Sequence, residues 1–213
     1  MGRTRIKICG VRTDADLTAA VWAGADAVGF NFVPASPRFV EPAEAAVLAR
    51  RLPAFVASVA VVAGLTADEV RAVHAACPTT LIQLHGDETP ELAASLPVPV
   101  VRAFRFDPAT VLGEMGRWDQ AENVAALLVD GSGGGQGRAF QWADLKRSRE
   151  LTIPIIVAGG LTPENVGEAI RTLFPYAVDV ASGVESVRGV KDPERIKRFC
   201  HAVRSADHEI YQD

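Results

Sequence analysis

The amino-acid sequence predicts an α/β protein in which strands and helices alternate along the whole chain. Short runs rich in valine, isoleucine, alanine and phenylalanine recur through its 213 residues, and each run is followed by a stretch with the apolar spacing of an amphipathic helix. No linker divides the series, and the length suits one domain built around a single core.

We expect eight strands and eight helices in alternating order. The strands are predicted at residues 5–9, 27–32, 57–62, 81–85, 100–106, 126–130, 153–158 and 177–182. The helices are predicted at residues 13–22, 42–51, 67–76, 90–95, 108–115, 142–150, 163–173 and 193–205. Several of the helices open with proline, which fits the first helical turn because the N–H group that proline lacks would have no partner there.

Alternating strands and helices can form either an open, doubly wound sheet or a closed barrel. An open sheet is expected to carry a nucleotide-binding fingerprint, GxGxxG, after its first strand. The motif is missing there, and the glycine-rich segment 131–137 (GSGGGQG) does not contain it either. Eight evenly spaced units suit closure. We therefore predict a single-domain (β/α)8 TIM barrel over residues 1–205, followed by a polar, frayed C-terminal tail at residues 206–213.

Composition argues against several classes of partner. The net charge is −4 and the basic residues are scattered, so we expect no nucleic-acid partner. No apolar run approaches the roughly 18 residues of a membrane helix, and residues 1–7 lack the apolar core of a signal peptide, so we expect no membrane association and a cytoplasmic location. The cysteines are far apart and the histidines form no HxH or HExxH motif, so we expect neither a disulfide nor a metal site.

The first predicted strand ends in a candidate catalytic group, Cys9. In a barrel of this kind the active site lies at the carboxyl ends of the strands. Cys9 stands there beside Gly10, near the N-terminus of the next helix, which favours a thiolate. A lone buried cysteine is more often a small packing residue, and we assign that role to Cys77 and Cys200.

The sixth predicted strand ends in a second candidate, Asp130, which would point into the mouth of the barrel. An aspartate at this place can also be a turn or helix cap. The following glycines Gly133, Gly134 and Gly135 expose backbone N–H groups without side chains, which suits a loop that closes over an anion. The pattern therefore favours a catalytic role for Asp130.

The loops after strands seven and eight are predicted to bind phosphate. Barrels commonly hold a phosphate group there through backbone N–H groups and a helix N-terminus. Both loops carry suitable small residues, namely Gly159, Gly160, Ser182 and Gly183. One such loop alone would indicate an ordinary turn, but both together indicate a small phosphorylated substrate.

Four further polar residues fall at inward positions of the predicted strands. Lys7 and Asp179 precede their strand ends, and because a buried charge must be paired, we predict a buried and chiefly structural ion pair between them. Gln83 and His85 share one face of strand four and are expected to line the mouth of the barrel as substrate-binding residues. For His85, a purely structural histidine is the alternative.

Six segments of the sequence resemble the phosphoribosylanthranilate isomerases of tryptophan biosynthesis. They are residues 7–10 (KICG), 29–38 (GFNFVPASPR), 83–87 (QLHGD), 128–137 (LVDGSGGGQG), 158–165 (AGGLTPEN) and 178–185 (VDVASGVE). Each segment alone is weakly informative, but all six in this order are highly specific. The resemblance covers nearly the whole chain.

The resemblance implies an Amadori rearrangement of N-(5′-phosphoribosyl)anthranilate to 1-(2-carboxyphenylamino)-1-deoxyribulose 5-phosphate, without a cofactor. It implies that Asp130 is the general acid that opens the furanose ring and that Cys9 is the general base that takes the proton from C2′. It also implies that Arg38 binds the anthranilate carboxylate and that the glycine loops contact the phosphate. Gln136 stands where the family often has threonine, and Asn31 lies at a position that varies within the family. These differences leave the detailed contacts of the loop after strand six open.

The same residues argue against two related enzyme functions and leave two alternatives open. The related histidine-pathway isomerase would need an aspartate where this chain has Cys9, and a pentulose-phosphate epimerase would need metal-binding histidines at strand ends. A barrel that binds sugar phosphates without turnover, or an isomerase that serves both the tryptophan and the histidine pathway, stays open as an alternative. We expect a monomer, with a homodimer as the second possibility.

Overall fold

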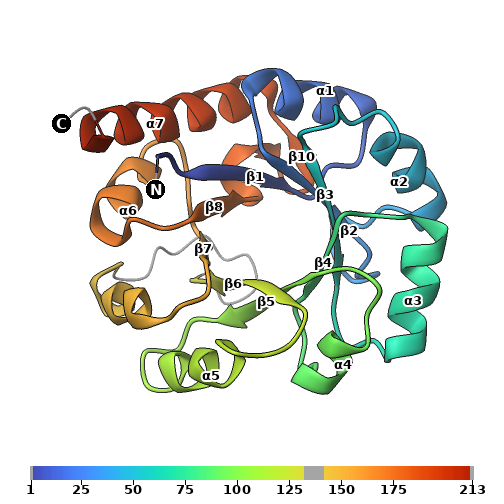
Figure 1. Cartoon of the computed structure of the whole chain (residues 1–213). Helices are drawn as coiled ribbons and strands as arrows, with labels where there is room; N and C mark the ends of the chain where they lie inside the picture. Colours follow the sequence, from blue (N-terminus) through green and yellow to red (C-terminus); the bar gives the residue numbers. More distant parts are fainter. Residues whose placement is uncertain (1, 132–141, 212–213) are drawn as a thin grey trace.

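The strands of the protein close into a barrel. The computed structural model describes residues 2–131 and 142–211, and there eight parallel strands form one closed sheet in which each strand pairs with the next and β8 pairs with β1 (Figure 1). These strands are β1 (Arg5–Cys9), β2 (Ala27–Asn31), β3 (Ala57–Val62), β4 (Leu81–Leu84), β5 (Val100–Arg105), β6 (Val124–Asp130), β7 (Ile155–Ala158) and β8 (Ala177–Val180). The predicted (β/α)8 barrel is confirmed.

Helices surround the barrel on its outside (Figure 1). They are α1 (Asp14–Ala23), α2 (Pro42–Ala49), α3 (Ala67–Ala76), α4 (Pro90–Ala94), α5 (Val111–Trp118), the 3-10 helix η1 (Trp142–Glu150), α6 (Val166–Leu173) and α7 (Pro193–Tyr211). Capping boxes begin two of them: the side chains of Thr13 and Thr66 accept a hydrogen bond from the third helical residue, whose carboxylate accepts one from the backbone of the threonine. These local signals explain why α1 and α3 start close to their predicted positions.

Two predicted helix starts are wrong. Residues 108–110 and 163–165 form turns, so α5 begins at Val111 and α6 begins at Val166. Asn165 explains the later start of α6, because its side chain accepts a hydrogen bond from the Thr162 N–H and donates one to the Gly160 carbonyl. The predicted helix at residues 142–150 forms as a 3-10 helix.

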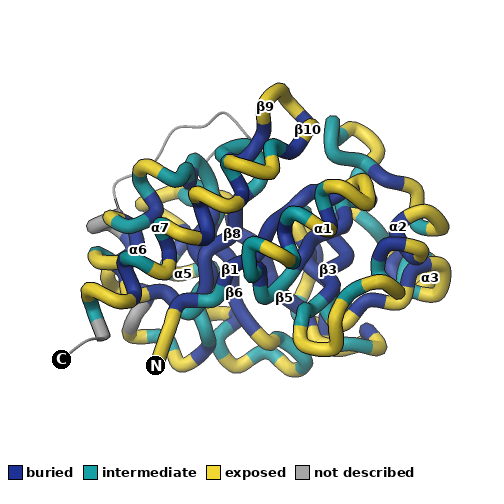
Figure 2. The backbone as a smooth tube through the Cα atoms, turned by 90° about the horizontal axis from the view of Figure 1, so that it is seen from above, coloured by how far each residue is buried: buried dark blue, intermediate teal, exposed yellow. Residues whose placement is uncertain are grey.

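Buried residues run along the strands of the barrel (Figure 2), and their apolar side chains form two layers, one inside the barrel and one between the barrel and its helices. The inner layer consists of Val101, Ala103, Ala126, Leu128, Ile156, Ala158 and Ala177. Residues of the opposite parity, such as Val100 and Val157, belong to the outer layer. The alternation follows from the two-residue period of a strand, and it brings Cys9 and Asp179 to the inner side near the barrel mouth.

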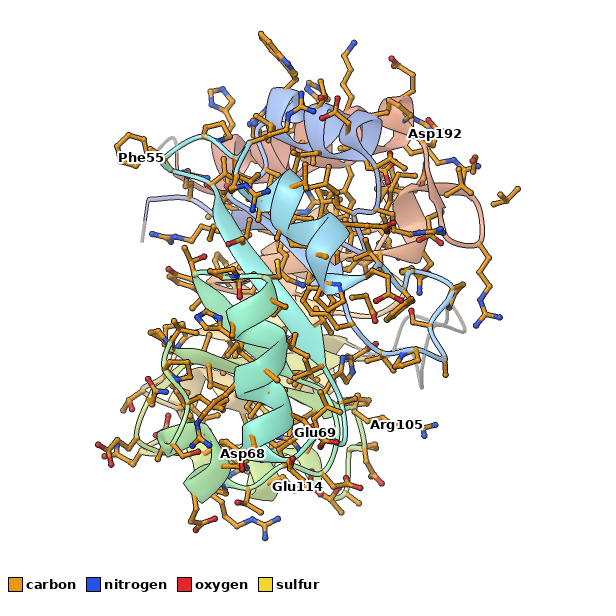
Figure 3. The ribbon with its side chains drawn as sticks, turned by 90° about the vertical axis from the view of Figure 1, so that its right-hand side faces the viewer. Phe55, Asp68, Glu69, Arg105, Glu114 and Asp192 are labelled. Carbon is orange, nitrogen blue, oxygen red and sulfur yellow. The ribbon has the colours of Figure 1, made fainter. Side chains whose placement is uncertain are left out.

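Between β8 and α7 the chain forms a segment that the sequence did not predict. It comprises a short 3-10 helix, η2 (Ser182–Val184), and a hairpin of β9 (Glu185–Val187) and β10 (Val190–Lys191) at the edge of the molecule (Figure 2). Gly189 in the turn has φ 85°, a left-handed conformation that favours glycine. Asp192, labelled in Figure 3, follows the hairpin, and its carboxylate accepts hydrogen bonds from the first N–H groups of α7.

The prediction of a frayed C-terminal tail at residues 206–213 is wrong. Helix α7 continues past residue 205 to Tyr211, and only residues 212–213 of the tail lie outside the described part of the chain. The carboxylate of Asp207 accepts hydrogen bonds from both the N–H and the hydroxyl of Thr4, each at 2.7 Å, and Ala206 is buried. These contacts tie the polar end of the helix to the start of β1.

Over the described residues, we find no helix with the length and apolar character that a membrane crossing requires.

Candidate active site

A cavity of about 160 Å³ opens at the carboxyl ends of the strands, where a barrel keeps its active site. It is lined by Cys9, Asn31, Arg38, Val61, Gln83, His85, Leu128, Asp130, Ala158, Gly159, Gly160, Leu161, Asp179, Val180, Ala181 and Ser182. Both candidate catalytic groups, Cys9 and Asp130, therefore face one space. Gly183 is absent from this lining, and Gly133, Gly134, Gly135 and Gln136 lie outside the described residues.

The thiol of Cys9 is almost fully buried at the end of β1. On the neighbouring strand Gly29 pairs with Cys9, and a methyl group on Gly29 would come 3.1 Å from Sγ of Cys9 and 3.2 Å from Nζ of Lys7. The glycine therefore leaves room for the thiol and the ammonium group together. Burial raises the pKa of Cys9, and the positive charge of Lys7 only partly offsets this effect.

Lys7 and Asp179 form a buried ion pair one inward position deeper than Cys9. Nζ of Lys7 lies 2.9 Å from Oδ1 of Asp179, and the two residues are partners in the register of β1 with β8. Burial lowers the pKa of Lys7, but the charges of Asp179 and Cys9 outweigh it and the pKa is raised overall. Lys7 therefore stays positively charged beside the thiol.

Asp130, at the end of β6, faces the imidazole of His85. Nε2 of His85 lies 3.7 Å from Oδ2 of Asp130, which is an ion-pair distance but beyond a hydrogen bond. Nδ1 of the same ring lies 3.4 Å from Nε2 of Gln83, whose buried Oε1 has no hydrogen-bond partner among the described residues. Burial lowers the pKa of His85 more than the Asp130 charge raises it, so the ring is neutral near neutral pH.

The loops after β7 and β8 pack against each other. Gly159 and Gly160 both adopt positive φ, 84° and 67°, in the bend that follows β7, a backbone conformation that favours glycine. A methyl group on Gly183 would overlap the carbonyl oxygen of Leu161. Only glycine at position 183 therefore lets the two predicted phosphate-binding loops meet.

Arg38 reaches the cavity from the loop between β2 and α2, and it is held by a residue to which the sequence assigned no role. Its Nε and Nη2 donate to Oε1 and Oε2 of Glu185 at 2.6 and 2.9 Å. Glu185 begins β9 and is buried. The sequence signal that could have indicated Glu185 is a lone carboxylate after a strand-end glycine, which is too common to be specific.

Among the described residues, no cluster of three or more histidine, cysteine, aspartate or glutamate side chains could hold a metal ion.

The family model described as N-(5′-phosphoribosyl)anthranilate (PRA) isomerase matches residues 6–202 of the chain. The chain belongs to this family. The resemblance carried by the six sequence segments is confirmed, and the chain is an isomerase of tryptophan biosynthesis that acts on N-(5′-phosphoribosyl)anthranilate.

Similar PRA isomerases agree in length and fold. The enzyme of Methylibium petroleiphilum is 45% identical over 212 residues, covering 98% of this chain and 97% of the relative. The crystal structure of the Thermotoga maritima enzyme superimposes with a TM-score of 0.86 at 34% identity, covering 95% of this chain and 99% of that one. A PRA isomerase solved with reduced 1-(o-carboxyphenylamino)-1-deoxyribulose 5-phosphate gives a TM-score of 0.83 at 33% identity, with the same shares covered.

Proposed function

We propose that Asp130 and Cys9 carry out the two proton transfers of the PRA isomerase reaction in this chain. The observation that carries the proposal is their placement: the two side chains come from β6 and β1 and line the same cavity at the barrel mouth. A ring opening and a proton abstraction on one sugar need an acid and a base that reach the same small molecule. A single cavity with one candidate for each role meets that need.

Asp130 acts first, as the general acid. Its carboxyl donates a proton to the furanose ring oxygen, so that the ring opens to a protonated imine. The neighbouring His85 is neutral near neutral pH and faces the carboxyl of Asp130 from β4. His85 and Gln83 therefore serve as substrate-binding groups beside the acid.

Cys9 acts second, as the general base. Its thiolate removes the proton from C2′ of the imine, and the resulting enolamine tautomerises to the ketone. Burial opposes ionisation of the thiol, while the ammonium group of Lys7 favours it. In this proposal the Lys7–Asp179 pair is more than structural, because it keeps a positive charge beside the base.

The two ends of the substrate bind on different loops. The phosphate is proposed to lie against the backbone of Gly159, Gly160, Ser182 and Gly183, and the proposal keeps Gly133, Gly134 and Gly135, which lie outside the described residues, as further substrate-binding residues. Arg38 binds the carboxylate of the anthranilate ring. The ligand named in the solved family structure carries both a carboxyphenyl group and a phosphate, which supports two such anion sites.

We further infer that the chain works as a monomer in the cytoplasm. The proposed acid, base and carboxylate-binding residue, Asp130, Cys9 and Arg38, all belong to one chain, so the proposed chemistry needs no residue from a second copy. A homodimer remains the alternative, and light scattering on the purified protein decides between them. Cell fractionation tests the location.

Turnover by the purified chain tests the proposed function. We expect the protein to convert N-(5′-phosphoribosyl)anthranilate to a product with the mass of the ketone isomer, and to complement a tryptophan auxotroph. A histidine auxotroph run in parallel separates a single-pathway isomerase from a dual one. A chain that binds the substrate but does not convert it would be the non-catalytic barrel.

A further inference from the structure

We propose that Glu185 is a positioning residue for substrate recognition: its carboxylate, which is itself fixed by Lys191, holds one edge of the Arg38 guanidinium group, so that the remaining N–H groups meet the carboxylate of the substrate. The proposal rests on the proposed role of Arg38. It assigns a function to the β9–β10 hairpin, which contributes both Glu185 and Lys191.

The carboxylate of Glu185 is fully occupied by protein donors. Oε1 accepts from Nε of Arg38 at 2.6 Å and from Nζ of Lys191 at 3.0 Å, and Oε2 accepts from Nη2 of Arg38 at 2.9 Å and from the Gly189 N–H at 3.0 Å. Burial alone would raise the pKa of Glu185, but Arg38 and Lys191 outweigh it and hold the pKa below its ordinary value. The group is therefore an ionised, fixed anchor with no capacity left for a ligand.

Lys191 connects this anchor to the loop after β8. Its side chain is fully buried, and Nζ donates both to Glu185 and to the carbonyl of Ala181 at 2.8 Å. Ala181 precedes Ser182 in the proposed phosphate-binding loop. One network thus joins the proposed binding sites for the two anionic ends of the substrate.

Two basic side chains share the one carboxylate of Glu185. Arg38 and Lys191 both form ion pairs with it, and burial lowers the pKa of Lys191 more than the charge of Glu185 raises it. A ligand carboxylate beside Arg38 would give the guanidinium group a second anionic partner.

Two glycines leave the space that the side chain and the loop of Arg38 occupy. A methyl group on Gly10 would come 2.5 Å from Cδ of Arg38, so the glycine after Cys9 leaves the space that the arginine side chain crosses. A methyl group on Gly189 would come 2.6 Å from the carbonyl oxygen of Pro37. Arg12 donates to that same carbonyl at 3.1 Å, which fixes the loop of Arg38 against the hairpin.

The free edge of Arg38 remains for a ligand. A guanidinium group has five N–H donors, and Glu185 takes those at Nε and on one side of Nη2. Nη1 has no hydrogen-bond partner within residues 2–131 and 142–211, although Arg38 lines the cavity together with Cys9 and Asp130. A carboxylate that binds at this second edge would be held in the orientation that Glu185 imposes.

The experiment compares two substrates in the full chain: N-(5′-phosphoribosyl)anthranilate and its aniline analogue, which lacks the carboxylate. For Glu185→Gln we expect the preference for the carboxylate substrate, measured as the ratio of the two kcat/KM values, to fall by about tenfold or more, as loss of a charge-assisted hydrogen bond predicts. The loss should appear mainly in KM. Glu194→Gln, an exposed glutamate on α7, is the matched control and should keep the ratio.

Two further variants separate the outcomes. Arg38→Met should abolish the preference for the carboxylate substrate. If it does so while Glu185→Gln keeps the full ratio of the two kcat/KM values, Glu185 has no positioning role, although Arg38 still binds the carboxylate. If Arg38→Met also keeps the ratio, Arg38 does not bind the carboxylate and both proposals fall. If Glu185→Gln fails to fold, Glu185→Asp takes its place. Aspartate keeps the negative charge that pairs with Lys191 but is too short to accept hydrogen bonds from both Arg38 nitrogens. An unchanged ratio of the two kcat/KM values in Glu185→Asp would overturn the proposal.

Discussion

Nζ of Lys7 lies 2.9 Å from Oδ1 of Asp179, so a positive charge is fixed inside the barrel one inward position below Cys9. The pair does two things at once. It satisfies two charges that would otherwise be buried alone, and it places the ammonium group where it favours the thiolate form of Cys9.

Replacing the lysine separates these two effects. Lys7→Met leaves Asp179 buried without its partner, and we expect a loss of about 3–5 kcal/mol in the free energy of unfolding. The pKa of Cys9 should rise as well, which lowers kcat at neutral pH. The double variant Lys7→Met with Asp179→Asn should recover stability without recovering kcat. Denaturant unfolding and steady-state kinetics measure both, and full activity in Lys7→Met would contradict a role of the charge in catalysis.

The pH dependence of the rate follows from the raised pKa of Cys9. Its base form is the thiolate, and burial raises the thiol pKa above its ordinary value of 9.0 in the unliganded protein. The ionised fraction of Cys9, and with it the contribution of the base to kcat/KM, therefore increases as pH rises above neutrality. Profiles of kcat/KM against pH in the unmodified chain and in Asp130→Asn, where the proposed acid no longer titrates, check this. A profile of Asp130→Asn that falls from neutral pH upward would show that Cys9 is not the base.

Alkylation distinguishes Cys9 from the other two cysteines. Burial raises the pKa of Cys77 and of Cys200 to about 11, and both are fully buried, whereas Cys9 lines the cavity. Iodoacetamide should modify Cys9 first, faster at higher pH, and substrate should protect it. Mass spectrometry of the digested protein identifies the modified residue. Earlier modification of Cys77 or Cys200 would be inconsistent with the cavity as described.

The contact between the two phosphate loops is tested by Gly183→Ala. The added methyl group would overlap the Leu161 carbonyl, so the loops must separate and KM for the phosphorylated substrate should rise by about tenfold or more. Gly113→Ala in α5 is the control, because a methyl group there meets nothing within 4 Å and should leave KM unchanged. Equal KM values for the two variants would argue against phosphate binding at this junction.

The end of α7 is predicted to contribute stability and no catalysis. Asp207→Ala removes both acceptors of Thr4, and leaving those buried donors unpaired should cost about 1–3 kcal/mol of the free energy of unfolding. Because Asp207 does not line the cavity, kcat and KM should stay as in the unmodified chain. Thermal unfolding and kinetics on the same preparation measure the two effects. Unchanged stability would show that the contacts of Asp207 with Thr4 do not stabilise the end of α7.

The barrel itself could be predicted because its signal is repeated. Each of the eight strands is a short apolar run followed by helical spacing, and errors of one or two residues at strand ends leave the inward parity of Cys9 and Asp179 unchanged. The contact of Lys7 with Asp179 follows from that parity together with the cost of burying an unpaired charge.

The hairpin and the helix end could not be predicted, for a physical reason. β9 and β10 are too short to show a strand period, and the bonds of Glu185 to Arg38 join residues far apart in sequence. In the same way Asp207 looks like a solvated charge until β1 brings Thr4 beside it. Local patterns contain no information about such partners, whereas the closed barrel fixes them.

The most direct test of Cys9 and Asp130 as base and acid is the steady-state rate of PRA isomerisation, followed as loss of substrate fluorescence, in Cys9→Ser and Asp130→Asn. We expect kcat to fall by at least about a hundredfold in each variant, while both still bind the reduced product analogue. The full rate in either variant would contradict the assignment of these two groups to the two proton transfers.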